Sequence, residues 1–206
     1  MPSSWLKNRR REHYYRKAKD EKYRSRASYK LLEMAGKYNF LKEGDVVVDL
    51  GAAPGGWLQA ARKIVGNNGF VLGVDLYPIK PMDEVNIHII VGDISDQEIT
   101  KQIKNILPSK ADVVISDVAP NVSGVWEVDH ARQIGLARCS LTIAIKIMRV
   151  GGNLFVKAFQ GDLFNNFIRE VKVYFRRVKI VKPKASRPQS AEVFVLGLHL
   201  KKQASA

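Results

Sequence analysis

The sequence predicts a doubly wound α/β fold, in which helices cover both faces of a mostly parallel sheet. The chain has 206 residues, a length that suits one domain of roughly 100–200 residues. Its hydrophobic content of 46% and charged content of 26% are typical of globular proteins. Short apolar runs alternate along the chain with segments of helical periodicity. That alternation is the pattern of parallel strands joined by crossover helices.

The first half of the chain alternates helix and strand. Apolar residues at helical spacing predict a helix over Arg26–Lys37, with Gly36 near its end. Val46–Leu50 is a short apolar run bounded by glycines, which predicts a buried strand. The predicted elements that follow are a helix over Gly56–Val65, strands over Gly69–Leu76 and Ile87–Val91, a helix over Asp96–Leu107 and a strand over Ala111–Ser116.

The second half continues in the same way and ends on two strands. The predicted elements are a long helix over Asp129–Met148, a strand over Asn153–Ala158, a helix over Asp162–Phe175, and strands over Val178–Val181 and Glu192–Leu200. Residues 182–191 contain two prolines and leave no room for a crossover helix. We therefore expect a seven-stranded sheet whose last strand is antiparallel. Residues 1–25 are expected to form a basic N-terminal extension, 26–200 the domain and 201–206 a C-terminal tail.

Several classes of protein are excluded by simple features of the sequence. The longest stretch without a charged residue is Leu50–Ala61, too short for the roughly 18 residues of a membrane-spanning helix. Basic residues from Lys7 onward precede any apolar run, so we expect no signal peptide and a cytoplasmic protein. Cys139 is the only cysteine, which rules out an internal disulfide and a cysteine-based zinc site. We expect no membrane partner and no structural metal.

The net charge of +14 is concentrated at the two ends of the chain. Residues 1–30 hold 11 basic and 3 acidic residues, residues 172–206 hold 9 and 1, and the middle of the chain is close to neutral. Such a distribution suits a polyanion such as nucleic acid, although charged ends are often only solvated. The candidate RNA-binding residues are Arg9, Arg10, Arg11, Arg24, Arg26, Lys182, Lys184 and Arg187.

A glycine-rich turn follows the first predicted strand, in the segment Asp49–Trp57. Its glycines allow a tight turn and a close approach of the backbone to a ligand. The spacing is neither the dinucleotide fingerprint nor a phosphate-binding P-loop, and glycine and proline also punctuate ordinary loops. The turn alone is therefore a moderate signal.

Acidic residues also follow the next three predicted strands. Asp75, Asp93 and Asp117 each lie at the carboxyl end of a strand, where doubly wound sheets bind ligands. Asp75 lies 24 residues beyond Gly51, near the roughly 20 typical of a carboxylate that binds ribose hydroxyls. A single aspartate there is as often a turn former. Three of them beside a glycine turn predict a nucleoside cofactor.

Two lysines and a glutamate occupy further notable positions. Lys157 ends the fifth strand in an apolar context, Glu192 opens the seventh strand, and Lys30 lies on the first helix. Each also has an ordinary interpretation as a surface charge, which the sequence alone favours for Lys30.

With these residues in place, the sequence resembles the FtsJ/RrmJ (RlmE) family of S-adenosylmethionine-dependent ribose 2′-O-methyltransferases. The resemblance extends from about Tyr14 to His199 and includes four residues of catalytic type in the order Lys, Asp, Lys, Glu. The segments that carry it are Arg24–Leu31, Asp49–Trp57, Gly73–Leu76, Ser116–Asp117, Phe155–Lys157 and Arg187–Glu192.

The resemblance implies a Rossmann-like class I methyltransferase fold and a set of site residues. The implied catalytic tetrad is Lys30, Asp117, Lys157 and Glu192. The implied contacts to S-adenosylmethionine are made by Gly55, Trp57, Asp75, Asp93 and Asp117. The implied substrate is a uridine of large-subunit ribosomal RNA, or a transfer RNA in a second branch of the family. We expect a monomer that acts on RNA within the large ribosomal subunit.

Lys157 is the residue we expect to accept the proton of the ribose hydroxyl. Lysine is normally protonated at neutral pH, but burial and a neighbouring cation such as Lys30 favour the neutral amine. Asp117 and Glu192 act in the opposite direction, so a charged Lys157 that orients the hydroxyl lone pair is the alternative.

Two other functions share part of this pattern. A nicotinamide-dependent oxidoreductase would use the glycine turn and Asp75, but it leaves Lys30 and Glu192 without a role. A non-catalytic RNA-binding protein would explain the charge, but not the complete set of four residues. Stabilisation by S-adenosylmethionine rather than NAD, and transfer of label from S-adenosylmethionine to RNA, would separate these functions.

Overall fold

In the computed structural model, which describes residues 13–202, seven strands form one sheet in the order β3-β2-β1-β4-β5-β7-β6. The first five strands run parallel, while β7 is antiparallel to both of its neighbours, β5 and β6. The predicted sheet and its antiparallel last strand are thus confirmed. The strands are β1 (Val46–Leu50), β2 (Phe70–Asp75), β3 (Ile87–Val91), β4 (Ala111–Ser116), β5 (Met148–Phe159), β6 (Phe175–Val181) and β7 (Glu192–Leu200).

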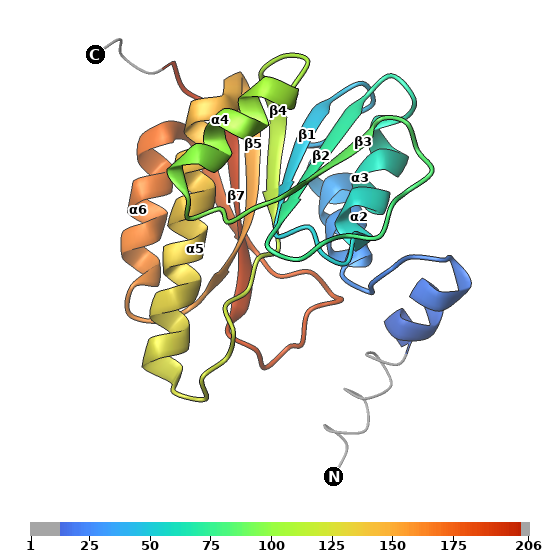
Figure 1. The fold of residues 1–206 in the computed structure, drawn as a ribbon. Coiled ribbons are helices and arrows are strands. Elements are labelled where there is room, and N and C mark those ends of the chain that lie inside the picture. The colour runs from blue at the N-terminus through green and yellow to red at the C-terminus, as the bar shows by residue number, and fades with distance from the viewer. Residues whose placement is uncertain (1–12, 203–206) are drawn as a thin grey trace.

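Helices cover the sheet on both sides (Figure 1). One hydrophobic cluster joins α4, α5 and α6 to one face, and a second joins α2 and α3 to the other. All five residues of the central strand β1 are buried, as expected for a strand covered on both faces. The helices are α2 (Ser28–Tyr38), α3 (Gly56–Val65), α4 (Gln97–Ile106), α5 (Trp126–Ile147) and α6 (Phe164–Tyr174).

Helix α5 begins three residues earlier than the apolar periodicity predicts, at Trp126 rather than Asp129. Asp129 lies inside the first turn and accepts hydrogen bonds from the main-chain N–H groups of Ser123 and Gly124, at 2.7 and 3.2 Å. The Ser123 hydroxyl also donates to it at 2.7 Å. These bonds hold the preceding loop against the first turn of the helix. The helix can therefore begin at Trp126, before the residues of its apolar face.

The described part of the basic N-terminal segment packs against the domain. Residues 13–20 are helical, and Ala18 is buried in a small cluster with Tyr29 and Ala185. The Tyr14 ring lies 5.5 Å from the Tyr29 ring. The segment therefore contacts both α2 and the loop between β6 and β7. These contacts bring the N-terminal and C-terminal parts of the chain together.

The carboxyl ends of the parallel strands all lie at one edge of the sheet, the lower edge in Figure 1. The β4–α5 and β6–β7 loops are found at this same edge, together with the helical segment 13–20 (Figure 1). This arrangement gathers the predicted functional residues from both halves of the chain.

Candidate active site

The glycine turn after β1 adopts a left-handed backbone conformation that favours glycine. Gly51 and Gly55 adopt positive φ angles of 82° and 106°. A Cβ atom on Gly51 would lie 2.7 Å from the Cβ of Val118, and one on Gly55 would lie 2.3 Å from the Cε of Met82. The backbone conformation disfavours a side chain at both positions, and at Gly51 the Val118 backbone also leaves no space for one.

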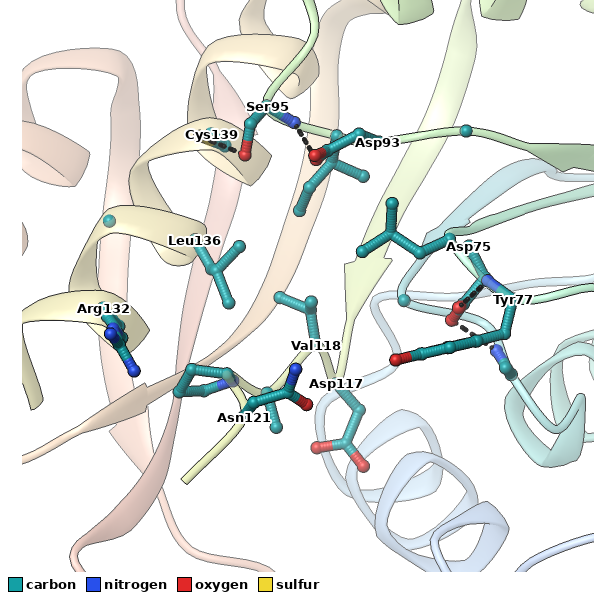
Figure 2. Close-up of a pocket in the computed structure, with 18 residues that line it drawn as sticks. Asp75, Tyr77, Asp93, Ser95, Asp117, Val118, Asn121, Arg132, Leu136 and Cys139 are labelled. Atoms are coloured by element: carbon teal, nitrogen blue, oxygen red, sulfur yellow. Dashed lines mark hydrogen bonds between the residues drawn. The ribbon is translucent and has the colours of Figure 1, made fainter. Parts of the chain in front are cut away.

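A cavity of about 840 Å³ opens beside this turn, at the carboxyl ends of β1 to β4. Its volume is within the roughly 300–1,000 Å³ of small-molecule sites. Asp75, Asp93 and Asp117 all line it, as the sequence predicts (Figure 2). Gly51 and Leu136 contribute part of the remaining wall.

Two of these carboxylates are held in place by main-chain donors. Asp75 accepts hydrogen bonds from the N–H groups of Ala53 and Tyr77, at 2.8 and 2.9 Å (Figure 2). Asp93 accepts one from Ser95 at 2.7 Å. An ionised carboxylate has about four lone-pair sites, so each retains acceptors for ligand hydroxyl or amino groups. The residues present therefore fit a nucleoside, whose ribose offers two hydroxyl donors.

Gly55 and Trp57, the other predicted cofactor contacts, do not line this cavity. Trp57 is buried, donates its indole N–H to the Ala27 carbonyl at 2.7 Å, and stacks on Phe155. This arrangement packs α3 against the β5 strand and the start of α2. A direct contact of Gly55 or Trp57 with cofactor stays a prediction.

The four residues of the predicted tetrad meet next to the cavity. Lys30 Nζ lies 2.8 Å from Glu192 Oε1 and 3.5 Å from Asp117 Oδ2. Lys157 Nζ lies 3.2 Å from Asp117 Oδ1. Asp117 is thus the link between the two lysines, and it also lines the cavity. The structure brings together residues from α2, β5, β7 and the loop after β4.

The charges of Lys30 and Glu192 stabilise each other. Burial lowers the pKa of Lys30, but the carboxylates of Asp117 and Glu192 outweigh this effect, and its pKa is raised. Burial raises the pKa of Glu192, but the Lys30 charge and hydrogen bonds from Lys30 and Ser186 prevail, and its pKa is lowered. Both groups are therefore ionised at neutral pH.

Lys157 is buried and donates to the main-chain carbonyl of Asp117 at 2.6 Å. Its main-chain carbonyl accepts a hydrogen bond from Gln133 at 3.2 Å, which ties β5 to α5. The buried Oδ1 atom of Asp117 has no hydrogen-bond partner among residues 13–202, although Lys157 Nζ lies close to it. The Lys157 amine and the Asp117 carboxylate thus lie side by side, and Asp117 alone of the two lines the cavity.

Asp49 is a buried acid that the prediction of site residues did not include. It belongs to β1, is completely buried, and neither carboxyl oxygen has a hydrogen-bond partner within the described chain. Burial, together with repulsion from Asp117 and Asp75, raises its pKa well above the usual value. The sequence does indicate such a residue, because Asp49 is the single acid inside the apolar run Val46–Leu50.

We expect Asp49→Asn to stabilise the protein near neutral pH. In acid, the carboxyl is protonated in both folded and unfolded chains. As the pH rises above the unfolded value of about 4, the unfolded chain releases the proton while the folded chain retains it, so the free energy of unfolding falls. An amide has no such proton. Thermal unfolding should therefore show a higher melting temperature for the variant near neutral pH, and a smaller gain in acid.

The exposed Asp83 provides a matched control, because Asp83→Asn removes a carboxylate that folding does not bury. The Asp49→Asn variant should melt above the unaltered protein near neutral pH. An equal or lower melting temperature would contradict the inference that Asp49 is protonated in the folded protein.

The described candidate RNA-binding residues lie in two different settings. The Arg24 guanidinium donates to the carbonyls of Lys80 and Pro81 at 2.5 and 2.6 Å, and Lys182 donates to those of Pro188 and Ser190 at 3.0 and 2.5 Å. These bonds stabilise loops. Arg26 donates to the Ala185 carbonyl at 3.4 Å, and Lys184 and Arg187 are exposed. Arg9, Arg10 and Arg11 lie outside the described residues.

Within residues 13–202 no group of three or more His, Cys, Asp or Glu side chains is arranged to hold a metal ion. None of the helices described is long and apolar enough to cross a membrane.

A nucleoside-sized cavity lies at the carboxyl edge of this Rossmann-like sheet and is joined through Asp117 to a lysine–carboxylate cluster, the arrangement expected of a methyltransferase that uses S-adenosylmethionine. The chain belongs to the FtsJ-like methyltransferase family, whose sequence model matches residues 23–200. The predicted family, enzyme class and cofactor are thus confirmed, and the nicotinamide-dependent oxidoreductase is not supported.

Relatives of known name cover nearly the whole chain. "Ribosomal RNA large subunit methyltransferase E" of Methanococcus maripaludis is 52% identical over 193 residues, which are 94% of this chain and 75% of the relative. The protein of that name from Methanocaldococcus jannaschii is 48% identical and covers 93% and 80%. A crystal structure from Plasmodium falciparum, 29% identical, superimposes with a TM-score of 0.76 over 88% of this chain and 100% of that one.

Aeropyrum pernix fibrillarin with bound S-adenosyl-L-methionine has a TM-score of 0.57 and 20% identity, over 85% of this chain and 75% of that one. At this lower sequence identity, the similarity shows that the two proteins share a fold.

Proposed function

We propose that the protein transfers a methyl group from S-adenosylmethionine to the ribose 2′-hydroxyl of a uridine in large-subunit ribosomal RNA, within the ribosomal subunit. The observation that carries the proposal is the position of Asp117, which lines the cofactor cavity and contacts both lysines of the cluster. The names of the relatives support ribosomal RNA as the substrate.

The reaction requires alignment of the two reactants and a place for one proton. Bound S-adenosylmethionine supplies a methyl group on a positively charged sulfur, an already activated electrophile. The protein must therefore bring the hydroxyl oxygen into line with that methyl group and receive the hydroxyl proton. Asp75 and Asp93 would hold the ribose and base of the cofactor, and Asp117 would mark the boundary between cofactor and RNA.

In this proposal Lys157 accepts the hydroxyl proton. Its amine already donates to the main-chain carbonyl of Asp117, the residue that lines the cavity. Lys30 remains charged between Asp117 and Glu192 and positions both carboxylates. The Glu192 carboxylate also accepts a hydrogen bond from Ser186 at 2.7 Å, which anchors the β6–β7 loop at the site.

Mapping 2′-O-methyl nucleotides by mass spectrometry, in total RNA from cells with and without this protein, tests the proposal. A single uridine of large-subunit ribosomal RNA should lose its methyl group when the protein is absent. Loss confined to transfer RNA would contradict the proposed substrate, and no loss in any RNA would contradict the proposed activity.

The RNA is expected to bind a surface formed by both ends of the chain. The main-chain N–H of Lys184 donates to the Glu33 carboxylate at 2.8 Å, and Ala18 packs on Ala185. The basic N-terminal segment and the β6–β7 loop are therefore neighbours at the carboxyl edge of the sheet. Positive charge from both would face the same stretch of RNA backbone.

We expect Lys182→Gln with Lys184→Gln to weaken RNA binding and to flatten its salt dependence. Each lost phosphate contact should reduce the slope of log affinity against log salt by about 0.7–0.9. Neutralising Arg9–Arg11 should act in the same way, and S-adenosylmethionine affinity should change in neither variant. Filter binding at several salt concentrations measures the slope.

The matched control removes two exposed lysines near the opposite edge of the sheet, Lys110 and Lys146. If all three variants bind RNA with the same slope as the unaltered protein, the basic ends serve solubility and the RNA surface lies elsewhere.

A further inference from the structure

An exposed aromatic cluster lies next to the catalytic lysine and has no role in the chemistry described so far. Trp126, the first residue of α5, is 46% exposed. Its ring is nearly parallel to the Phe159 ring, with centroids 6.0 Å apart and planes at 17°. It is also stacked with the His130 ring, at 5.7 Å and 21°. A large aromatic residue is thus held at the surface, stacked against two rings, with nearly half of its reference surface open to solvent.

The cluster is adjacent to the tetrad. Phe159 is the last residue of β5 and lies two positions after Lys157, so their side chains leave the strand on the same face, about 7 Å apart at Cα. Phe159 is also paired directly with Glu192 in the antiparallel ladder between β5 and β7. A single nucleotide at Lys157 is therefore close enough to reach the aromatic rings.

Trp126 is held in place before any RNA binds. The carboxylate of Asp129 accepts three hydrogen bonds from Ser123 and Gly124, which fold the preceding loop onto the first turn of α5. His130 is buried, and its Nε2 atom accepts a hydrogen bond from the Leu163 main-chain N–H at 3.1 Å. The indole ring rests on neighbours that are fixed to α5 and to the start of α6, so little conformational freedom remains to be lost on binding.

The proposed reaction creates a need for such a surface. A ribose hydroxyl can reach a cofactor inside a cavity only if its nucleotide leaves the stack of its neighbours. Proteins that bind unstacked nucleotides replace the lost stacking with aromatic side chains. Trp126 lies beside the site, is rigidly held and is exposed, which are the properties that this replacement requires.

We propose that Trp126 is the stacking platform for a nucleobase of the RNA substrate, either that of the target nucleotide or that of its immediate neighbour. This inference rests on the proposed function of the site. Every base has a π face, so the platform adds affinity for an unstacked nucleotide without reading its identity. The exposed side chains of Val122 and Val125, in the loop before Trp126, extend the apolar surface.

The test compares Trp126→Ala with Trp126→Phe. The substrate is an unmodified transcript of large-subunit ribosomal RNA, and methyl transfer is followed with labelled S-adenosylmethionine. Loss of one base–aromatic stack should raise the KM for RNA by about 5- to 150-fold in the alanine variant. The phenylalanine variant should recover most of this loss. S-adenosylmethionine affinity and melting temperature should stay near those of the unaltered protein in both.

Val173→Ala is the control for removal of an exposed apolar side chain, because Val173 lies on α6 and is 65% exposed. An unchanged KM for RNA in Trp126→Ala would overturn the proposal. So would a Trp126→Phe variant as impaired as Trp126→Ala, because a stacking role must tolerate another aromatic ring.

A second readout is independent of turnover. Photocrosslinking of the unaltered protein to a transcript substituted with 5-iodouridine should place the crosslink on Trp126. Crosslinks confined to other residues would overturn the platform. An unaltered protein that crosslinks at Trp126 but transfers no methyl group would contradict the proposed function and leave the platform supported.

Discussion

Replacing Lys157 by alanine should abolish methyl transfer to RNA while the affinity for S-adenosylmethionine stays nearly unchanged. Lys157 does not line the cofactor cavity, and its Nζ atom contacts only the carbonyl and carboxylate of Asp117 among the interactions described. Positioned general bases contribute about 10²–10⁴-fold to rates. We expect a loss of at least that size. Single-turnover methylation and calorimetric cofactor binding measure the two properties separately.

Lys157→Arg distinguishes the two roles considered for this lysine. Arginine stays protonated in proteins and cannot accept the hydroxyl proton, but it keeps a positive charge near Asp117. If Lys157 accepts the proton, the arginine variant should be about as inactive as the alanine variant. Substantial activity in Lys157→Arg would instead indicate a charged group that orients the hydroxyl. Loss of cofactor binding together with activity would contradict the separation of cofactor and RNA sites.

Asp75→Ala should have the opposite profile, with weak cofactor binding and activity that is partly restored at high S-adenosylmethionine concentration. Hydrogen bonds to charged groups contribute about 1.5–3 kcal/mol, which corresponds to an affinity loss of roughly 10- to 150-fold. Two effects combine in this variant. A carboxylate acceptor is lost from the cavity, and the N–H groups of Ala53 and Tyr77 lose the partner that shapes the wall.

Asp75→Asn serves as the matched variant, because the amide retains one oxygen acceptor of nearly the same shape. Its affinity should fall between those of the alanine variant and the unaltered protein. Calorimetric titration with S-adenosylmethionine measures all three. Unchanged affinity in Asp75→Ala would leave Asp75 as a turn residue, the role that its two main-chain hydrogen bonds already give it.

The Lys157 and Asp75 variants test two sites that meet at Asp117, the lysine–carboxylate cluster and the cofactor cavity. Lys157 contacts Asp117 from outside the cavity, on the side where the cluster meets RNA in the proposed reaction. Asp75 lies within the cofactor cavity (Figure 2). If binding and transfer respond separately, the cluster and the cavity are two sites that share a single carboxylate.

Local sequence patterns predict most of the fold. The strands Val46–Leu50, Ile87–Val91 and Ala111–Ser116 have the predicted boundaries, as does helix α3. The boundaries of the buried strands β1 and β4 can be predicted because the change from apolar to polar or glycine residues at their ends is abrupt, and the edge strand β3 is followed directly by Gly92. The antiparallel last strand could also be predicted, since residues 182–191 cannot cross the sheet. Its place between β5 and β6 could not, because several strand orders satisfy the same loop length.

The alignment of strand ends allowed part of the site to be predicted as well. Parallel strands place their carboxyl ends at a common edge, so Asp75, Asp93 and Asp117 were expected to meet, and they line one cavity. For Lys30 the sequence alone favoured a surface charge on a helix. Only the packing of α2 against the sheet places Lys30 between Asp117 and Glu192, whose carboxylates stabilise its positive charge.

Other properties were decided by contacts between distant segments. The tertiary structure gives Arg24 and Lys182 carbonyl partners and buries Trp57 in the core. It also leaves the Asp49 carboxyl group without a hydrogen-bond partner among residues 13–202 and opens Trp126 to solvent. Periodicity along the chain reports which face of an element is buried, because burial repeats with the geometry of that element. It carries no information about which atoms from other elements surround a given side chain. The sequence therefore specifies the elements and the chemical groups, and packing decides which of those groups become a site.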